Sequence, residues 1–173
     1  ELDGDNHARI IAAAASLIAS GGRAAATTRA VAAAAAVQAP AIYRLFGDKD
    51  GLLDAVAASA FAEYVETKSR RPLTEDPIAD FRRDWDAHVA FGLSNPEVFA
   101  LMHVNGRTPP SHAWTTGITI VRESIRRIAR EGRLRVSEEL AVDLVDAGVS
   151  GTVLSLLRKA PDEHDAVNAA ARE

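Results

Sequence analysis

Basic side chains gather in the N-terminal part of the chain, where they could neutralise phosphate groups. Between Arg9 and Lys49 five residues are basic and only Asp48 is acidic, which gives this segment a net charge of +4, whereas the whole chain of 173 residues has a net charge of −4. Phosphate contacts in nucleic-acid-binding proteins require clustered Lys and Arg. The charge pattern therefore singles out this segment, although the protein as a whole is acidic. The basic residues are Arg9, Arg23, Arg29, Arg44 and Lys49.

Helices must position these side chains, because the composition favours helix throughout. Alanine is abundant, aromatic residues make up 5% of the chain, and runs of β-branched residues are short, so the summed intrinsic preference is helical. The N-terminal segment predicts a first helix from Asp5 or Asn6 to the Gly21-Gly22 pair. A short second helix opens at Thr27-Thr28, and a break follows near Ala36-Val37. The inward stripe of the first helix comprises Ile10, Ala14, Leu17 and Ile18.

A third short helix is predicted over residues 39–46. Ile42 and Phe46 are four residues apart and would share its buried side. Tyr43 and Arg44 would then be turned toward solvent, where their side chains are available to a partner.

The order of these helices is informative. Two short helices separated by a tight turn, with one helix before them and a long one after them over residues 49–69, are the layout of a DNA-binding helix-turn-helix. In that motif the second short helix enters the major groove of double-stranded DNA. The sequence therefore predicts DNA binding through the third helix. Its groove-facing candidates are Gln38, Ala39, Pro40, Ala41, Tyr43 and Arg44.

The same segment resembles the TetR (tetracycline-repressor) family of transcriptional regulators over about residues 9–57. The spacing Tyr43-x-x-Phe46-x-x-Lys49 is a fairly specific part of the match. The resemblance implies that the Tyr43 hydroxyl donates to a phosphate and that Lys49 contacts the DNA backbone as a point charge. It also implies that Thr28 binds phosphate at the start of the second helix. The matching runs are residues 27–32, 35–38, 41–49 and 52–53.

Few side chains in this segment can read bases directly. Arg29, Gln38 and Arg44 have the chemistry to reach base edges or nearby phosphates, and Ala39 or Ala41 could touch a thymine methyl group. We therefore expect the shape of the DNA to carry part of the specificity. The predicted DNA-binding set is Thr28, Arg29, Gln38, Ala39, Pro40, Tyr43, Arg44 and Lys49.

Two features depart from the family pattern. Ala36 occupies a turn position where the family usually has glycine and where a positive φ is often needed. The second helix has almost no polar residues after Arg29. These departures keep an alternative function open, that of a TetR-like helical ligand sensor or interaction module that has lost DNA binding.

The second half of the chain predicts five more helices, near residues 76–94, 96–105, 111–131, 137–159 and 161–173. The expected fold is therefore all-α with about nine helices. It comprises an N-terminal three-helix helix-turn-helix domain over residues 1–50 and a C-terminal helical ligand-binding and dimerisation domain over residues 51–173.

The resemblance implies that the C-terminal domain binds a small apolar or amphipathic ligand. Aromatic, histidine and apolar side chains recur there at helical spacing, and a mostly apolar cavity with a few polar groups is the usual small-molecule site. The same residues could equally belong to the ordinary core. The candidates are Phe81, Trp85, His88, Phe99, Met102, His103, Trp114 and Ile118.

The resemblance also implies a homodimer that forms through the last two helices. Small residues in the eighth helix would let another helix approach closely, although this face could instead complete the core of a single chain. A twofold dimer predicts a palindromic operator read by helices about 34–36 Å apart. We expect a repressor whose ligand favours a form with wrongly spaced recognition helices. The interface candidates are Gly148, Gly151, Val153, Leu154 and Leu157.

Several classes of chemistry find no support in the sequence. The lack of cysteine excludes disulfides, thiolate metal sites and thiol nucleophiles. Metalloprotease, phosphate-loop and serine-elbow motifs are missing, so neither an enzyme nor a cofactor is expected, and His88 and His103 are not expected to bind a metal. No stretch reaches the about 18 apolar residues that span a membrane, and we expect a cytoplasmic protein. The single methionine is Met102, so residues ahead of Glu1 are expected.

Overall fold

The computed structural model describes residues 2–103 and 112–173, with the backbone alone at residues 2 and 3. Within these ranges every regular element is helical, which confirms the all-α prediction. None of the described helices combines the length and apolar character needed to cross a lipid bilayer. The helices are α1 (Leu2–Ala25), α2 (Thr28–Ala34), α3 (Ala39–Phe46), α4 (Lys49–Ser69), α5 (Pro77–Ser94), α6 (Pro96–His103), α7 (His112–Arg130), α8 (Glu138–Leu156) and α9 (His164–Arg172), with a 3₁₀ turn at Pro161–Glu163.

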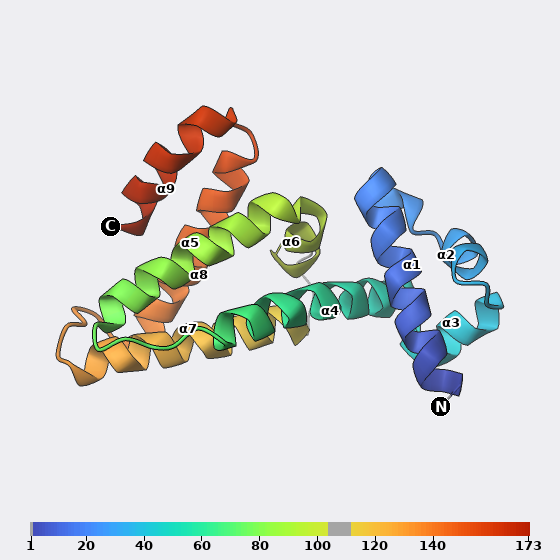
Figure 1. The fold of residues 1–173 in the computed structure, drawn as a ribbon, viewed down its shortest axis with the longest axis horizontal. Coiled ribbons are helices and arrows are strands. Elements are labelled where there is room, and N and C mark those ends of the chain that lie inside the picture. Colours follow the sequence, from blue (N-terminus) through green and yellow to red (C-terminus); the bar gives the residue numbers. More distant parts are fainter. Residues whose placement is uncertain (1, 104–111) are drawn as a thin grey trace. The chain divides into compact units, whose positions relative to one another are not determined.

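The chain, drawn as a ribbon in Figure 1, divides into two compact units. The first unit comprises Glu1–Glu63 and Glu97–Ala113, and the second comprises Tyr64–Pro96 and Trp114–Glu173. α4 is a continuous helix of 21 residues that contributes its first part to the first unit and its last part to the second. The predicted functional boundary after residue 50 stays a prediction, because a division by compactness does not test it.

α1 packs in the first unit through the stripe that its sequence predicted. Ile10, Ala14 and Ile18 are buried at a spacing of four residues, which places them on one helix face. The helical path breaks at the predicted glycine pair, where Gly21 has a φ of −147° and Gly22 a φ of +69°. Glycine adopts this positive φ without a steric penalty. The predicted end of the first helix is therefore a kink, after which α1 continues to Ala25.

The second unit has its own apolar core. α7 contributes Ile125 and Ile128, and α8 contributes Ala141 and Val142, to one buried cluster. The hydrophobic spacing along α7 therefore marks a packed seam. Partly buried side chains that pack against the cluster are Ile78, Phe81, Ile118, Val121, Leu134 and Val145.

A buried carboxylate ties the start of α5 to α7. The Asp80 side chain accepts hydrogen bonds from the Thr74 amide (2.9 Å) and from the Arg83 and Arg127 guanidinium groups (2.9 Å each). Arg127 also donates to the Thr74 carbonyl at 2.9 Å. Burial raises the pKa of the Asp80 carboxyl, but the hydrogen bonds from Thr74 and Arg127 outweigh it and the pKa lies below its ordinary value. The carboxylate is therefore charged and fully partnered inside the protein.

Candidate nucleic-acid interface

α2 begins at a threonine cap. The Thr27 hydroxyl accepts a hydrogen bond from the Ala30 amide at 3.1 Å, which satisfies one of the free amides of the first turn. Thr28 is the first helical residue and its side chain is partly exposed. Of the two predicted caps, Thr27 therefore fills the structural role, and this leaves Thr28 available to a partner.

The turn between α2 and α3 is left-handed at an alanine. The Val37 amide donates to the Ala32 carbonyl at 3.0 Å and the Ala36 amide donates to the Ala33 carbonyl at 3.2 Å, the two bonds of a Schellman motif. Ala36 has a φ of +52°, and among the described residues it is the only one other than glycine with a positive φ. The positive φ that the family pattern led us to expect is therefore present, and here it is carried by a residue with a Cβ.

α3 is held by its inner side and exposes its outer side. Ile42 is 1% exposed, and the Phe46 ring stacks on the His7 ring of α1 with their centroids 4.8 Å apart. On the opposite side Tyr43 is 53% exposed and Arg44 is also exposed. The orientation predicted for the third helix, with tyrosine and arginine toward solvent, is the observed one.

The junction between α3 and α4 is compact. The Asp48 carboxylate accepts a hydrogen bond from the Gly51 amide at 2.7 Å, and this caps α4. A Cβ on Gly51 would lie 2.0 Å from the Phe46 carbonyl oxygen, so a side chain at this position is incompatible with the observed path. Lys49 is the first residue of α4 and is partly exposed. The short junction fixes the spacing between Tyr43 and Lys49.

The predicted DNA-binding residues gather on α2, α3 and the first turn of α4, all in the first unit. None of them is buried, and the Gln38 side chain makes no capping hydrogen bond although the residue stands at the cap of α3. We call this set the recognition surface. Arg29, Gln38, Pro40, Tyr43 and Arg44 are exposed, and Thr28, Ala39 and Lys49 are partly exposed.

Sequence reasoning missed three residues that support this surface. His7 packs on α3, Gly51 permits the α3–α4 junction, and Arg9 donates hydrogen bonds to the end of α2. From the sequence Arg9 counted only as a positive charge. The exclusion of a side chain at Gly51 depends on where the Phe46 carbonyl lies, which no residue pattern discloses.

The eight predicted ligand-pocket residues do not form one group within a single unit. Phe99, Met102 and His103 belong to the first unit, where the Phe99 and His103 rings stack with centroids 4.1 Å apart. Trp114 belongs to the second unit. Phe81 and Ile118 pack against the core cluster of the second unit. The pocket made of these residues stays a prediction.

Trp85 and His88 lie on α5 within the second unit. Trp85 is buried, and its indole donates to the Asn168 side chain of α9 at 2.9 Å. The His88 ring contacts the Tyr64 ring edge-on, with centroids 5.7 Å apart. Both side chains therefore have structural partners in this unit.

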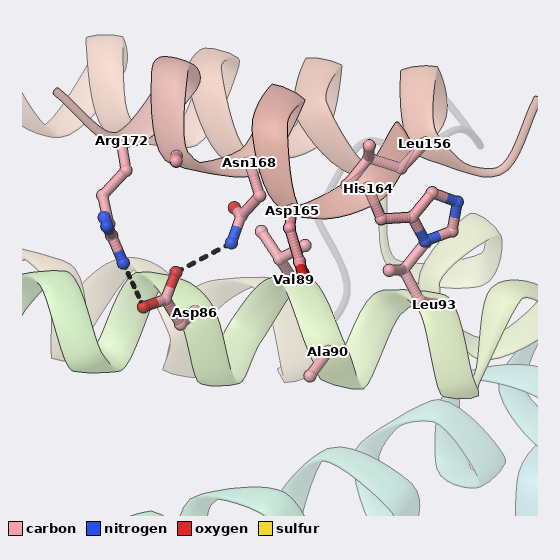
Figure 2. Close-up of a pocket in the computed structure, with 10 residues that line it drawn as sticks. Asp86, Val89, Ala90, Leu93, Leu156, His164, Asp165, Asn168 and Arg172 are labelled. Carbon is pink, nitrogen blue, oxygen red and sulfur yellow. Dashed lines mark hydrogen bonds and ion pairs between the residues drawn. The ribbon is translucent and has the colours of Figure 1, made fainter. Parts of the chain in front are cut away.

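A hollow of about 430 Å³ lies among α5, α8 and α9 in the second unit. Figure 2 shows Arg172 and Asn168 of α9 pointing toward Asp86 of α5. The Asn168 amide donates to Asp86 at 2.8 Å, and Arg172 forms an ion pair with the same carboxylate. The lining residues, none of them among the eight predicted ones, are Asp86, Val89, Ala90, Leu93, Leu156, His164, Asp165, Asn168, Ala169 and Arg172.

The predicted dimer residues differ in their exposure. Leu154 and Leu157 are 38% and 40% exposed, and Gly151 has open space around it. Val153 is fully buried, so it packs in the core of its own chain and offers no surface to a second copy. A Cβ on Gly148 would lie 3.1 Å from the Trp85 ring, so Gly148 makes room for a side chain of the same unit.

Known proteins share both the N-terminal motif and the fold. Residues 10–56 match the family described as bacterial regulatory proteins, tetR family. A comparison with curated protein sequences gives no match. A TetR variant with a glutamine-to-alanine change from Acinetobacter baumannii AYE, solved in complex with minocycline, is 28% identical, with a TM-score of 0.71 over 94% of this chain and 90% of that chain.

Two further solved structures extend the likeness of fold at lower identity. FadR from Bacillus subtilis in complex with stearoyl-CoA is 14% identical, with a TM-score of 0.73 over 95% of this chain and 97% of that chain. A tetR family transcription regulator from Shewanella sp. PV-4 is 18% identical, with a TM-score of 0.73 over 96% of this chain and 93% of that chain. Residues 10–56 of this chain therefore match the tetR family of bacterial regulatory proteins, and the chain as a whole has the fold of solved TetR-family regulators.

Proposed function

We propose that this chain is a ligand-responsive repressor that binds a palindromic operator as a homodimer. The observation that carries the proposal is the geometry of α3, whose buried Ile42 anchors the helix while Tyr43 on the other side is 53% exposed. In this arrangement Tyr43 and Lys49 contact phosphates, and Gln38 and Arg44 reach base edges or nearby phosphates. No enzymatic reaction and no cofactor are proposed, and DNA binding implies a cytoplasmic location.

We propose that α4 acts as a lever, which means that this helix transmits the effect of ligand binding to the DNA-binding residues. Lys49 stands at its first residue, and Tyr64, about 22 Å farther along the helix, belongs to the second unit. A ligand shifts the operator-binding equilibrium only by binding one form better than the other, and a hundredfold preference corresponds to about 2.7 kcal/mol. The continuity of α4 through both units supports this route.

The proposed ligand is small and apolar or amphipathic. Minocycline and stearoyl-CoA, the ligands in two of the similar structures, are amphipathic molecules of this kind. The ligand-binding residues that we propose are the eight predicted from the sequence. Operator affinity that is unchanged by a ligand with demonstrated binding would contradict the lever mechanism.

The first experiment selects bound fragments from random duplex DNA with the full chain. We expect a palindrome, which would establish the DNA-binding class and the twofold symmetry together. Tyr43→Phe combined with Lys49→Ala is expected to weaken binding to every duplex and to make the salt dependence shallower by about 0.9 for each phosphate that the variant no longer neutralises. Arg70→Ala, which removes an exposed charge from the second unit, is the control. Equal binding by the double variant and the wild type would contradict the proposal.

The second experiment tests the dimer. Leu144 is 57% exposed on α8, so Leu144→Glu is expected to dissociate a dimer that forms through this helix and to reduce operator affinity. Leu73→Glu is the matched control, because Leu73 is 66% exposed but lies outside the helices. The mass of each variant is measured by light scattering, and a Leu144→Glu protein of unchanged mass would remove this face from the interface.

The alternative function, a ligand sensor without DNA binding, is favoured by one specific observation. Ala36 carries a positive φ in the turn before α3, a conformation that costs an alanine free energy. A selection that recovers no DNA, together with ligand binding by the same preparation, would support this alternative.

A further inference from the structure

Arg9 links α1 to the turn of the helix-turn-helix. Its Nη2 atom donates to the Ala35 carbonyl at 2.6 Å and to the Ala36 carbonyl at 3.3 Å. Its Nη1 atom contacts the Asp5 carboxylate one helical turn earlier, also at 3.3 Å. The guanidinium group is therefore held on α1 while its free edge reaches the end of α2, 26 residues away in sequence.

The two carbonyls that Arg9 contacts need a partner. The last carbonyls of a helix have no intrahelical donor, and the C-terminal end of the helix dipole favours a cation. The Schellman bonds use the carbonyls of Ala32 and Ala33, and Arg9 supplies donors for those of Ala35 and Ala36. The turn at Ala36 is therefore bonded through its amide and through its carbonyl.

The hydrogen bonds from Arg9 are important because Ala36 has an unfavourable backbone conformation. The left-handed region is unfavourable for a residue with a Cβ, and such a conformation persists only where surrounding contacts determine it. The residue two positions farther along is Gln38, the cap of α3. A change in the backbone at Ala36 would therefore alter the direction in which α3 leaves the turn.

We propose that Arg9 is a positioning residue for DNA recognition. It fixes the strained turn at Ala36, and thereby the orientation of α3, without itself neutralising a phosphate. This inference rests on the proposed DNA-binding function. A competing role is a direct phosphate contact, because 45% of the Arg9 side chain is exposed. The two roles predict different responses to salt and to substitution by lysine.

The test uses the full chain and the duplex that it selects from a random pool, next to an unrelated duplex of equal length. Arg9→Gln is expected to weaken binding to the selected duplex on the order of tenfold, the factor that corresponds to one hydrogen bond. Binding to the unrelated duplex, which depends on charge alone, is expected to match that of Arg23→Gln. Arg23 is the matched control because its side chain is also 45% exposed, in an ion pair with Asp50.

Arg9→Lys separates positioning from charge. Lysine keeps the positive charge but lacks the planar fork that reaches two carbonyls, so a positioning role predicts that affinity for the selected duplex stays low. Restored affinity in Arg9→Lys would overturn the proposal. The proposal would also be overturned if the salt dependence of DNA affinity were shallower for Arg9→Gln than for Arg23→Gln by about 0.9 for each phosphate.

Two further measurements address the turn itself. In Arg9→Gln the Val37 amide, which donates to Ala32, is expected to exchange with solvent faster than in the wild type, whereas unchanged exchange would overturn the proposal. In the Ala36→Gly background Arg9→Gln is expected to cost less affinity, because glycine holds the turn without strain. If the wild type bound no duplex at all, the proposed function would fail, and amide exchange would still decide whether Arg9 holds the turn.

Discussion

The two compact units use side-chain hydrogen bonds over different sequence distances. In the first unit Arg9 reaches Ala35 over 26 residues and Arg23 reaches Asp50 over 27. In the second unit Arg127 reaches Asp80 over 47 residues, and Arg172 reaches Asp86 over 86. The recognition surface is therefore assembled from residues near one another in sequence, whereas the second unit depends on contacts that form only when distant segments meet.

The units also differ in where their ion pairs lie. In the first unit the Arg23–Asp50 pair is about half exposed, and exposed pairs contribute little stability. In the second unit the Asp80 side chain is 3% exposed and that of Arg127 is 23% exposed. The second unit also has exposed pairs, such as Arg70–Glu66, so the contrast with the first unit lies in the buried Asp80 carboxylate rather than in the ion pairs as a whole.

The largest expected effect is on stability and belongs to the second unit. Asp80→Ala leaves Arg127 beside a site with no carboxylate, and breaking a buried pair in this way is expected to cost about 3 kcal/mol in the free energy of unfolding, measured in urea. Asp50→Ala, which breaks the exposed pair of the first unit, is expected to cost less than about 1 kcal/mol. Similar costs for the two variants would remove the difference between the units.

The Asp80 carboxylate is also expected to make the stability of the protein depend on pH. Because the folded-state pKa of Asp80 lies below the ordinary value of 3.8, its stabilising contribution is complete above that value and is lost as the pH falls through the folded-state pKa. The wild type is therefore expected to lose stability below about pH 4 more steeply than Asp80→Ala. Parallel acid-unfolding curves for the two proteins would show that Asp80 is not the responsible group.

The next largest effect is expected at the α3–α4 junction of the first unit. Gly51→Ala places a methyl group 2.0 Å from the Phe46 carbonyl oxygen, and overpacking of this kind costs about 2 kcal/mol. Thermal unfolding and operator binding are both expected to weaken. Gly4→Ala in the same unit meets no atom within 4 Å and is expected to be neutral or stabilising. Wild-type behaviour of Gly51→Ala would show that the junction adjusts freely.

The smallest effect is expected at the strained turn. Ala36→Gly relieves the left-handed conformation but gives the unfolded chain more freedom, and the balance is expected to be a gain of about 0.5 kcal/mol in stability. The measurement is the urea concentration at the midpoint of unfolding. The slope of the free energy of unfolding against urea concentration is expected to stay unchanged. A loss of stability would mean that contacts of the Ala36 methyl group outweigh the strain.

Much of the first unit was predictable because its determinants are local. The spacing of Ile42 and Phe46 gave the orientation of α3, and the Gly21-Gly22 pair gave the break in α1. The predicted bounds of α3 and α4 agree with the structure. These features depend on helical periodicity and on turn chemistry, both of which are properties of short segments.

The second unit was predictable in its helices but not in its contacts. Val153 has the spacing of an interface residue, yet it is fully buried in its own chain. Gly148 predicts a close helix–helix contact, and the side chain beside it is Trp85 of α5 in the same chain. Periodicity identifies an apolar face of a helix, but it does not identify the segment that covers that face.

The helices, the helix-turn-helix and the outward side of α3 can be derived from the amino-acid sequence, because each follows from residues within a few turns of one another. The contacts of Arg9 with the turn at Ala36, of Asp80 with Arg127, and of α9 with Asp86 are visible only in the folded chain. Hydrogen bonds and packing act over a few ångströms in space, and separation along the chain does not reveal which residues come that close.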